Sequence, residues 1–157
     1  MFRAPIPDEI ELETTVEVQY SENWNLIGLP VIVEDSGYES FFEGAVSGTL
    51  YSFDNGYTLE TELVPGTGYW VRLESDELVN FTGGPIQELT IQLDEGWNLI
   101  SGISVSVPVE YIVDPGGLIV PETVYTFDGV YVNASVIEPG RAYWVRSSGE
   151  GEVIVQI

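Results

Sequence analysis

The stretch Tyr69-Trp70-Val71-Arg72 occurs again near the end of the chain as Tyr143-Trp144-Val145-Arg146. Each copy follows a Pro-Gly pair, Pro65-Gly66 in the first case and Pro139-Gly140 in the second. Pro-Gly indicates a turn, and the alternating residues behind it are typical of a half-buried strand. Alternation places the tyrosine and valine on one face, and the tryptophan and arginine on the other. The stretch therefore predicts the same strand twice.

Two further blocks repeat in the same order around this strand. Trp24-Asn25-Leu26-Ile27 recurs as Trp97-Asn98-Leu99-Ile100, and Tyr51-Ser52-Phe53-Asp54 recurs as Tyr125-Thr126-Phe127-Asp128. The offsets are 97 − 24 = 73, 125 − 51 = 74 and 143 − 69 = 74. Three blocks in one order at one spacing are the signature of an internal repeat.

Each repeat also contains weaker signals for strands, a hairpin and a short helix. Alternating residues predict a strand at 15–20 and 89–93, and a closing strand at 78–81 and 153–155. Asn55-Gly56 and Asp128-Gly129 are hairpin signals, one position apart in the repeat, so the two hairpins are expected to differ in register or to contain a bulge. Ser36 and Glu39 resemble a capping box on a short helix, and Pro108 favours a helical turn after it.

Together these signals predict an all-β protein. We expect two repeats related by a pseudo-twofold axis, forming a sandwich or barrel-like unit of about ten to twelve strands with one short helix per repeat. The expected boundaries are a lead-in or linker at 1–14, repeat 1 at 15–84 and repeat 2 at 85–157. Since one repeat alone is close to the size at which a core is marginal, the two are expected to pack together.

The composition excludes several classes of partner. The 157 residues contain 26 acidic residues against four Lys plus Arg, with no histidine, giving a formal net charge of −22. Binding to nucleic acid or to an anionic membrane surface needs clustered basic residues, so neither is expected. No apolar run approaches the ~20 residues of a membrane span, and no insertion is expected. The acidic surface itself is best explained by solubility, with salt adaptation or cation binding as alternatives.

The repeated blocks resemble a module that occurs in tandem near the C-termini of large secreted or cell-surface bacterial proteins. Its pattern combines Gly-Trp-Asn-Leu-Ile with Gly-Tyr-Trp-Val, and the chain follows it from about Thr15 onward. The chain departs from it at Asn23 and at Ala142, where glycine is usual. The resemblance implies an exported, multidomain parent protein that is extracellular or on the cell surface, with the rest of that parent as the partner. It implies no activity.

The residue types argue against catalysis. Histidine and cysteine are absent, and the only basic side chains are four arginines, so the common general bases and nucleophilic pairs are missing. The remaining acids fall in turns and on polar strand faces, which is typical of solvated carboxylates. We therefore expect no enzymatic activity and no obligatory cofactor. Calcium is the one candidate ion, with the repeated Asp54 and Asp128 as its candidate ligands, although turn chemistry alone explains both residues.

The tryptophans give the candidate ligand-binding residues. Trp24 and Trp97 share a strand face with Leu26 and Leu99, so we expect both rings in the core. Trp70 with Arg72, and Trp144 with Arg146, are the candidates for contact with a sugar, because an exposed indole stacks on a pyranose ring while arginine donates hydrogen bonds. The favoured alternative is structural, with each indole covered by the helical segment and stacked on its arginine by a cation–π contact.

Three functions remain open from the sequence. The leading one is a non-catalytic accessory module that acts as a structural or surface-presentation domain of an exported protein. The second is a carbohydrate-binding module with polysaccharide as the partner, which an exposed aromatic groove would favour. The third is a calcium-stabilised adhesion domain, which clustered carboxylates would favour.

Overall fold

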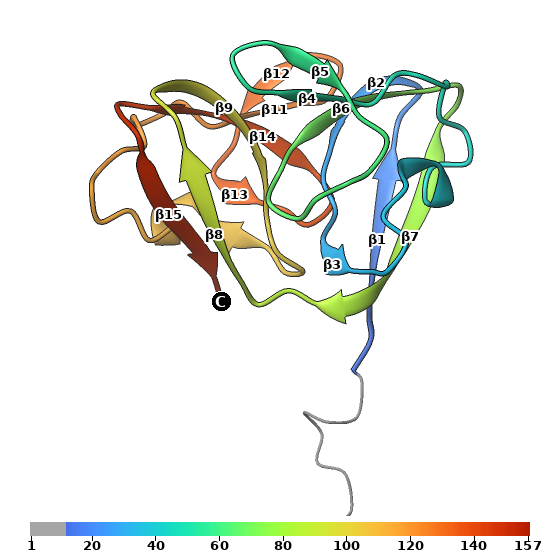
Figure 1. Cartoon of the computed structure of the whole chain (residues 1–157), viewed down its shortest axis with the longest axis horizontal. Coiled ribbons are helices and arrows are strands. Elements are labelled where there is room, and N and C mark those ends of the chain that lie inside the picture. Colours follow the sequence, from blue (N-terminus) through green and yellow to red (C-terminus); the bar gives the residue numbers. More distant parts are fainter. Residues whose placement is uncertain (1–11) are drawn as a thin grey trace, which may run out of the picture.

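The computed structural model in Figure 1 describes residues 12–157 and is built from β-strands joined by turns. These residues form fifteen strands and two short 3₁₀ turns, and contain no α-helix. The predicted all-β class is confirmed. Most of the lead-in expected at 1–14 lies outside the described residues, and the first strand begins at Thr14.

The first half of the chain forms a four-stranded sheet and a three-stranded sheet. The sheet orders are β2-β6-β4-β5 and β1-β7-β3. The strands are β1 (Thr14–Tyr20), β2 (Asn23–Ile27), β3 (Val31–Ile32), β4 (Tyr51–Phe53), β5 (Tyr57–Leu59), β6 (Tyr69–Leu73) and β7 (Glu77–Pro85).

The second half repeats this order of strands. The sheet β9-β14-β11-β12 has the same order as β2-β6-β4-β5, and β8-β15 corresponds to β1-β7. The strands are β8 (Glu88–Leu93), β9 (Gly96–Ser101), β10 (Val107–Pro108), β11 (Tyr125–Phe127), β12 (Tyr131–Asn133), β13 (Val136–Ile137), β14 (Ala142–Ser147) and β15 (Gly151–Gln156). Every pairing between these strands is antiparallel, and the sheets of residues 12–157 do not close into a barrel.

The strand count exceeds the expected ten to twelve because of very short strands. β3, β10 and β13 contain two residues each, which is too short to leave an alternating pattern in the sequence. The expected helices are also shorter than predicted. η1 (Tyr38–Ser40) and η2 (Val109–Tyr111) are each a single 3₁₀ turn.

The predicted capping box at Ser36 is wrong. The residue preceding η1 is Gly37, and no side chain caps the turn. The Asp35 carboxylate makes the local contacts around the turn instead, accepting hydrogen bonds from the Gly37 amide at 3.1 Å and the Ser40 hydroxyl at 2.9 Å. The hydrogen bond from the Gly37 amide, and to a smaller extent the one from the Ser40 hydroxyl, lowers the pKa of Asp35.

The two hairpins have the same register, contrary to the expected difference. Phe53 pairs with Tyr57 in one hairpin, and Phe127 pairs with Tyr131 in the other, so each loop contains three residues. The residue with positive φ is the middle one in both loops, Asn55 at 56° and Gly129 at 73°. Asn55 and Gly129 are thus equivalent, and the apparent shift arises only when the two glycines are aligned.

The repeated asparagines fix the turn before each Trp-Asn-Leu-Ile strand. Asn25 accepts a hydrogen bond from the Ser21 amide at 3.2 Å and donates to the Ser21 carbonyl at 2.7 Å. Asn98 makes the same pair of bonds with Asp94, at 2.9 Å each. A side chain that satisfies both backbone groups of one residue holds the turn closed, so this part of the motif has a structural role.

The residue before each of these tryptophans has a backbone conformation that favours glycine. Asn23 has a φ of 80° and Gly96 a φ of 97°, and only glycine adopts such values without steric cost. Asparagine is among the side chains that tolerate this region best. Asn23 can therefore adopt nearly the same conformation as Gly96 in the second repeat.

Each half encloses its own hydrophobic core. The first consists of buried residues between Val18 and Phe81, and the second of buried residues between Ile86 and Val155. The predicted inward face of the Tyr-Trp-Val-Arg strand is confirmed, because Tyr69, Val71 and Leu73 are all buried.

A third buried cluster joins the two halves. Leu26 from β2, Leu99 from β9 and Ala142 from β14 are buried together, and four partly buried aromatic side chains pack against them, Phe53, Trp70, Phe127 and Trp144. Residues of both halves thus share one apolar contact in the middle of the molecule.

The backbone contacts between the halves are reciprocal. Ile27 bridges to Arg141, and the equivalent residues, Ile100 and Thr67, bridge to each other. The amide of Gly28 donates to the Gly140 carbonyl at 3.2 Å, and the amide of the equivalent Ser101 donates to the Gly66 carbonyl at 2.9 Å. An interface in which i contacts j, and j contacts i, is the pattern produced by a twofold relation.

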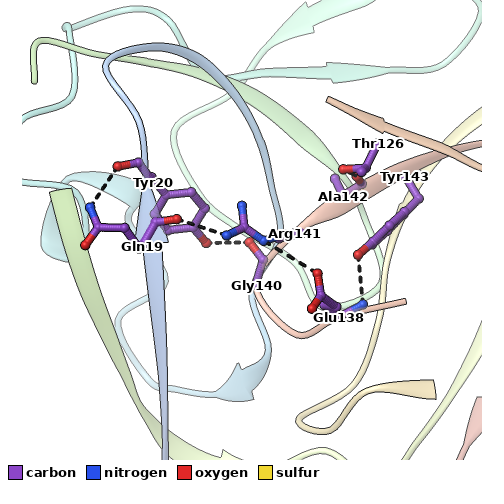
Figure 2. Close-up of polar contacts among 8 residues, drawn as sticks. All are labelled: Gln19, Tyr20, Thr126, Glu138, Gly140, Arg141, Ala142 and Tyr143. Atoms are coloured by element: carbon purple, nitrogen blue, oxygen red, sulfur yellow. Dashed lines mark hydrogen bonds and ion pairs between the residues drawn. The ribbon is translucent and has the colours of Figure 1, made fainter. Parts of the chain in front are cut away.

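One side of this junction carries additional polar contacts, which Figure 2 shows. The Tyr20 hydroxyl donates to the Gly140 carbonyl, and the Arg141 guanidinium lies 5.6 Å from the centre of the Tyr20 ring. Arg141 also donates to the Gln19 carbonyl at 3.0 Å and lies 3.9 Å from the Glu138 carboxylate. These contacts fasten the Pro-Gly turn of the second half to strand β1.

Candidate functional site

Two open clefts lie over the third cluster, and among residues 12–157 only aromatic side chains line them. The hairpins β4-β5 and β11-β12, which supply several of these side chains, lie next to each other at the top of Figure 1. Each cleft has a volume of about 400 Å³. The first is lined by Phe53, Trp97, Tyr125, Tyr131 and Trp144, and the second by Trp24, Tyr51, Tyr57, Trp70 and Phe127.

The ten side chains are five equivalent pairs from the two repeats. Trp24 matches Trp97 at an offset of 73, and the other four pairs match at an offset of 74. These are Tyr51 with Tyr125, Phe53 with Phe127, Tyr57 with Tyr131, and Trp70 with Trp144. The clefts are therefore two copies of one surface.

Each half donates one phenylalanine to the other half's cleft. Phe53, from the first half, packs against Trp144 with ring centroids 4.9 Å apart and planes at 77°. Phe127, from the second half, packs against Trp70 at 5.1 Å and 73°. These edge-to-face contacts are the favoured geometry for aromatic rings. Neither cleft is complete without the opposite half.

The expected burial of Trp24 and Trp97 is wrong. Their side chains are 40% and 41% exposed, although Leu26 and Leu99 on the same strand faces are buried. The strand face passes from the junction between the halves, where the leucines lie, to the open clefts, where the tryptophans lie. The alternation of side chains along a strand assigns a residue to a face, but it does not show how far along the strand that face is covered.

Trp70 and Trp144 are partly buried walls of the clefts. Trp70 stands edge-on to Trp24, with centroids 6.2 Å apart and planes at 89°. Within the described residues, Trp144 Nε1 is buried without a hydrogen-bond partner, so this indole offers a ligand its ring more readily than its N–H. The expected cover from the helical segment is replaced by a phenylalanine of the other half.

Arg72 and Arg146 lie opposite cleft tryptophans in the sheet but are not among the residues that line either cleft. Each is exposed and directly opposite an exposed tryptophan in the strand register, Arg72 opposite Trp24 and Arg146 opposite Trp97. The Arg72 Nε donates to Asn23 Oδ1 at 3.3 Å. Among residues 12–157, the only cation–π contact joins Arg141 to Tyr20, so the expected stacking of these arginines on indoles is not found.

The candidate calcium ligands are single carboxylates in the hairpin loops. Asp54 and Asp128 are exposed, and their amides donate to the carbonyls of Gly56 and Val130, both at 2.9 Å. In the part of the chain that the structure describes, no group of three or more acidic, histidine or cysteine side chains is placed to hold a metal ion. Asp54 shares a surface hollow with Glu60 and Asp94, but these carboxylates are not arranged as a metal-binding group.

The described residues contain no helix long and apolar enough to cross a membrane.

No protein-family model, no curated protein and no solved structure matches the chain.

Proposed function

We propose that this chain is a non-catalytic accessory module of an exported protein, and that it binds polysaccharide through its two aromatic clefts. Its two repeats are related by a pseudo-twofold axis, as the reciprocal contacts at their junction support. The observation that carries the proposal is the exposure of Trp24 and Trp97, each in a cleft and each opposite an arginine.

The chemistry of the lining favours sugar. Aromatic rings present flat apolar faces to the C–H groups of a pyranose, and a few polar groups at the edge of an apolar site give orientation. Arg72 and Arg146 supply donors opposite the exposed tryptophans, and the tyrosines of the lining add hydroxyl groups. A purely structural module has no need of two exposed tryptophans at equivalent positions.

The charge favours a neutral polysaccharide. A net charge of −22 repels a polyanion, while the arginine opposite each exposed tryptophan disfavours a cation beside that ring. Among the described residues, no carboxylate lines either cleft to attract a cationic ligand. An uncharged glycan meets neither penalty.

A depletion assay on insoluble polysaccharides tests the proposal. The wild type is mixed with cellulose, chitin and xylan, and the double variant Trp24→Ala/Trp97→Ala is compared with it. Tyr111→Ala is the matched control, because Tyr111 is a 68% exposed aromatic residue outside both clefts. We expect at least one polysaccharide to retain the wild type and the control but release the double variant. Equal retention of all three proteins, or retention of none, would contradict the proposal.

A further inference from the structure

The pseudo-twofold relation constrains the direction in which the two clefts hold a chain. The clefts lie side by side, since Tyr131 lines the first and its ring lies 6.5 Å from Trp70 of the second. An axis that relates two neighbouring sites on one face runs through that face. Rotation by half a turn about such an axis reverses any direction within the face.

Polysaccharide chains have a direction, because their reducing and non-reducing ends differ. A chain that fits one cleft in one direction fits the other in the opposite direction. One straight segment cannot satisfy both clefts in the same way. Two segments that run in opposite directions can, and each then meets an identical set of rings, tyrosine hydroxyls and one arginine.

The geometry points to a module that bridges two glycan segments instead of following one. We infer that each cleft is a separate site for a neutral glycan, so that one protein molecule joins two chains, or two antiparallel stretches of a chain. This inference rests on the proposed function and adds the number of binding sites per protein molecule and the joining of two glycan segments. Joining two chains would suit an accessory module that holds its parent protein in a polysaccharide layer, since two linked contacts release more slowly than one.

The construction of the clefts supports two sites of equal affinity. The exchanged rings have nearly the same geometry. The ring centroids of Phe53 and Trp144 are 4.9 Å apart with planes at 77°, and those of Phe127 and Trp70 are 5.1 Å apart with planes at 73°. Trp24 and Trp97 are equally exposed, at 40% and 41%. The asymmetric contacts of Tyr20 and Arg141 involve neither lining.

Calorimetric titration with cellohexaose, chitohexaose and xylohexaose tests the inference. We expect a binding stoichiometry of about two hexaose molecules per protein chain for the wild type, about one for Trp24→Ala or Trp97→Ala, and none for the double variant. Added to the matching soluble polymer (hydroxyethylcellulose, glycol chitin or arabinoxylan), the wild type should raise viscosity or turbidity. The single variants should bind that polymer without raising either.

The outcomes separate the inference from the proposed function. A wild-type stoichiometry of one, with binding abolished by either single variant, would show one continuous site and overturn the inference while leaving polysaccharide binding intact. Single variants that still bridge the polymer would also overturn it. Failure of every hexaose and every polymer to bind would remove the proposed function, and the inference with it.

Discussion

Gly68 and Ala142 occupy equivalent positions in the two repeats and face each other across the junction. A Cβ atom on Gly68 would lie 2.8 Å from the Ala142 Cβ and 2.9 Å from the Ile100 carbonyl oxygen, closer than real contacts allow. Gly28 and Ser101 form a second such pair, because a Cβ atom on Gly28 would lie only 2.1 Å from the Ser101 Cβ. Each pair has room for one side chain only, so the alanine at position 142 requires a glycine at the equivalent position 68.

This pairing predicts the effect of exchanging the two residues. Gly68→Ala should lower the free energy of unfolding by about 1–3 kcal/mol, as overpacking of a filled interior does. Adding Ala142→Gly removes the nearest clash and should restore part of that loss. Urea unfolding of the single and double variants measures the coupling. Additive losses in the double variant would show that the two residues do not share one space.

Replacement of the four tryptophans should divide them into two pairs by the loss in free energy of unfolding. Trp70→Ala and Trp144→Ala remove walls that pack on the buried junction and should each cost about 2 kcal/mol or more, toward the 3–5 kcal/mol of a fully buried ring. Trp24→Ala and Trp97→Ala should cost at most about 1 kcal/mol, because much of each ring is already in water. Denaturant unfolding of the four single variants compares the two pairs. Equal losses at all four positions would contradict the assignment of exposed and structural indoles.

The buried tyrosines predict instability in alkali. Burial raises the pKa of Tyr143 to about 12, and burial also raises the pKa of Tyr20 and Tyr69. A raised folded-state pKa means that the fold favours the neutral phenol. The neutral Tyr143 phenol therefore contributes fully to the free energy of unfolding below the ordinary tyrosine pKa of about 10. This contribution is lost as pH rises toward about 12. Circular dichroism should show unfolding in this window together with tyrosinate absorbance. Complete ionisation of tyrosine without loss of structure would refute this account of the core.

Salt and calcium should act differently on stability. With a net charge of −22, self-repulsion is relieved as the Debye length falls, so the melting temperature should rise between about 0.01 M and about 0.5 M sodium chloride. Calcium at millimolar concentration and fixed ionic strength should add little, since residues 12–157 contain no group of three or more side chains placed to hold a metal ion. A large increase specific to calcium, lost in Asp54→Asn/Asp128→Asn, would favour the adhesion-domain alternative instead.

The sequence predicted what depends on local pattern and repetition. Alternation identified the buried face of Tyr69, Val71 and Leu73, and the repeat identified equivalent strands. The pattern could not show which part of a strand face lies at the junction between the repeats and which part remains open. Trp24 and Trp97 were misplaced for this reason, since the junction covers Leu26 and Leu99 but ends before the indoles.

Most of the cleft residues were missed, although a signal was present. Tyr51, Phe53 and Tyr57 recur at one offset as Tyr125, Phe127 and Tyr131, and repetition of three aromatic residues around a hairpin exceeds what turn formation needs. The exchange of Phe53 and Phe127 between the halves could not be predicted. It depends on how the two repeats dock, and that docking involves contacts between residues far apart in the sequence, 144 − 53 = 91 positions in one case and 127 − 70 = 57 in the other.

Nuclear magnetic resonance of the four indole N–H groups tests the central claim most directly. The hexaose that binds in the calorimetric titration is added stepwise to ¹⁵N-labelled protein. We expect the indole signals of Trp24 and Trp97 to move together, while the backbone signals around Tyr111, outside the clefts, stay in place. Binding that leaves the Trp24 and Trp97 signals unchanged, or that shifts signals on another face of the molecule, would show that the aromatic clefts are not the ligand site.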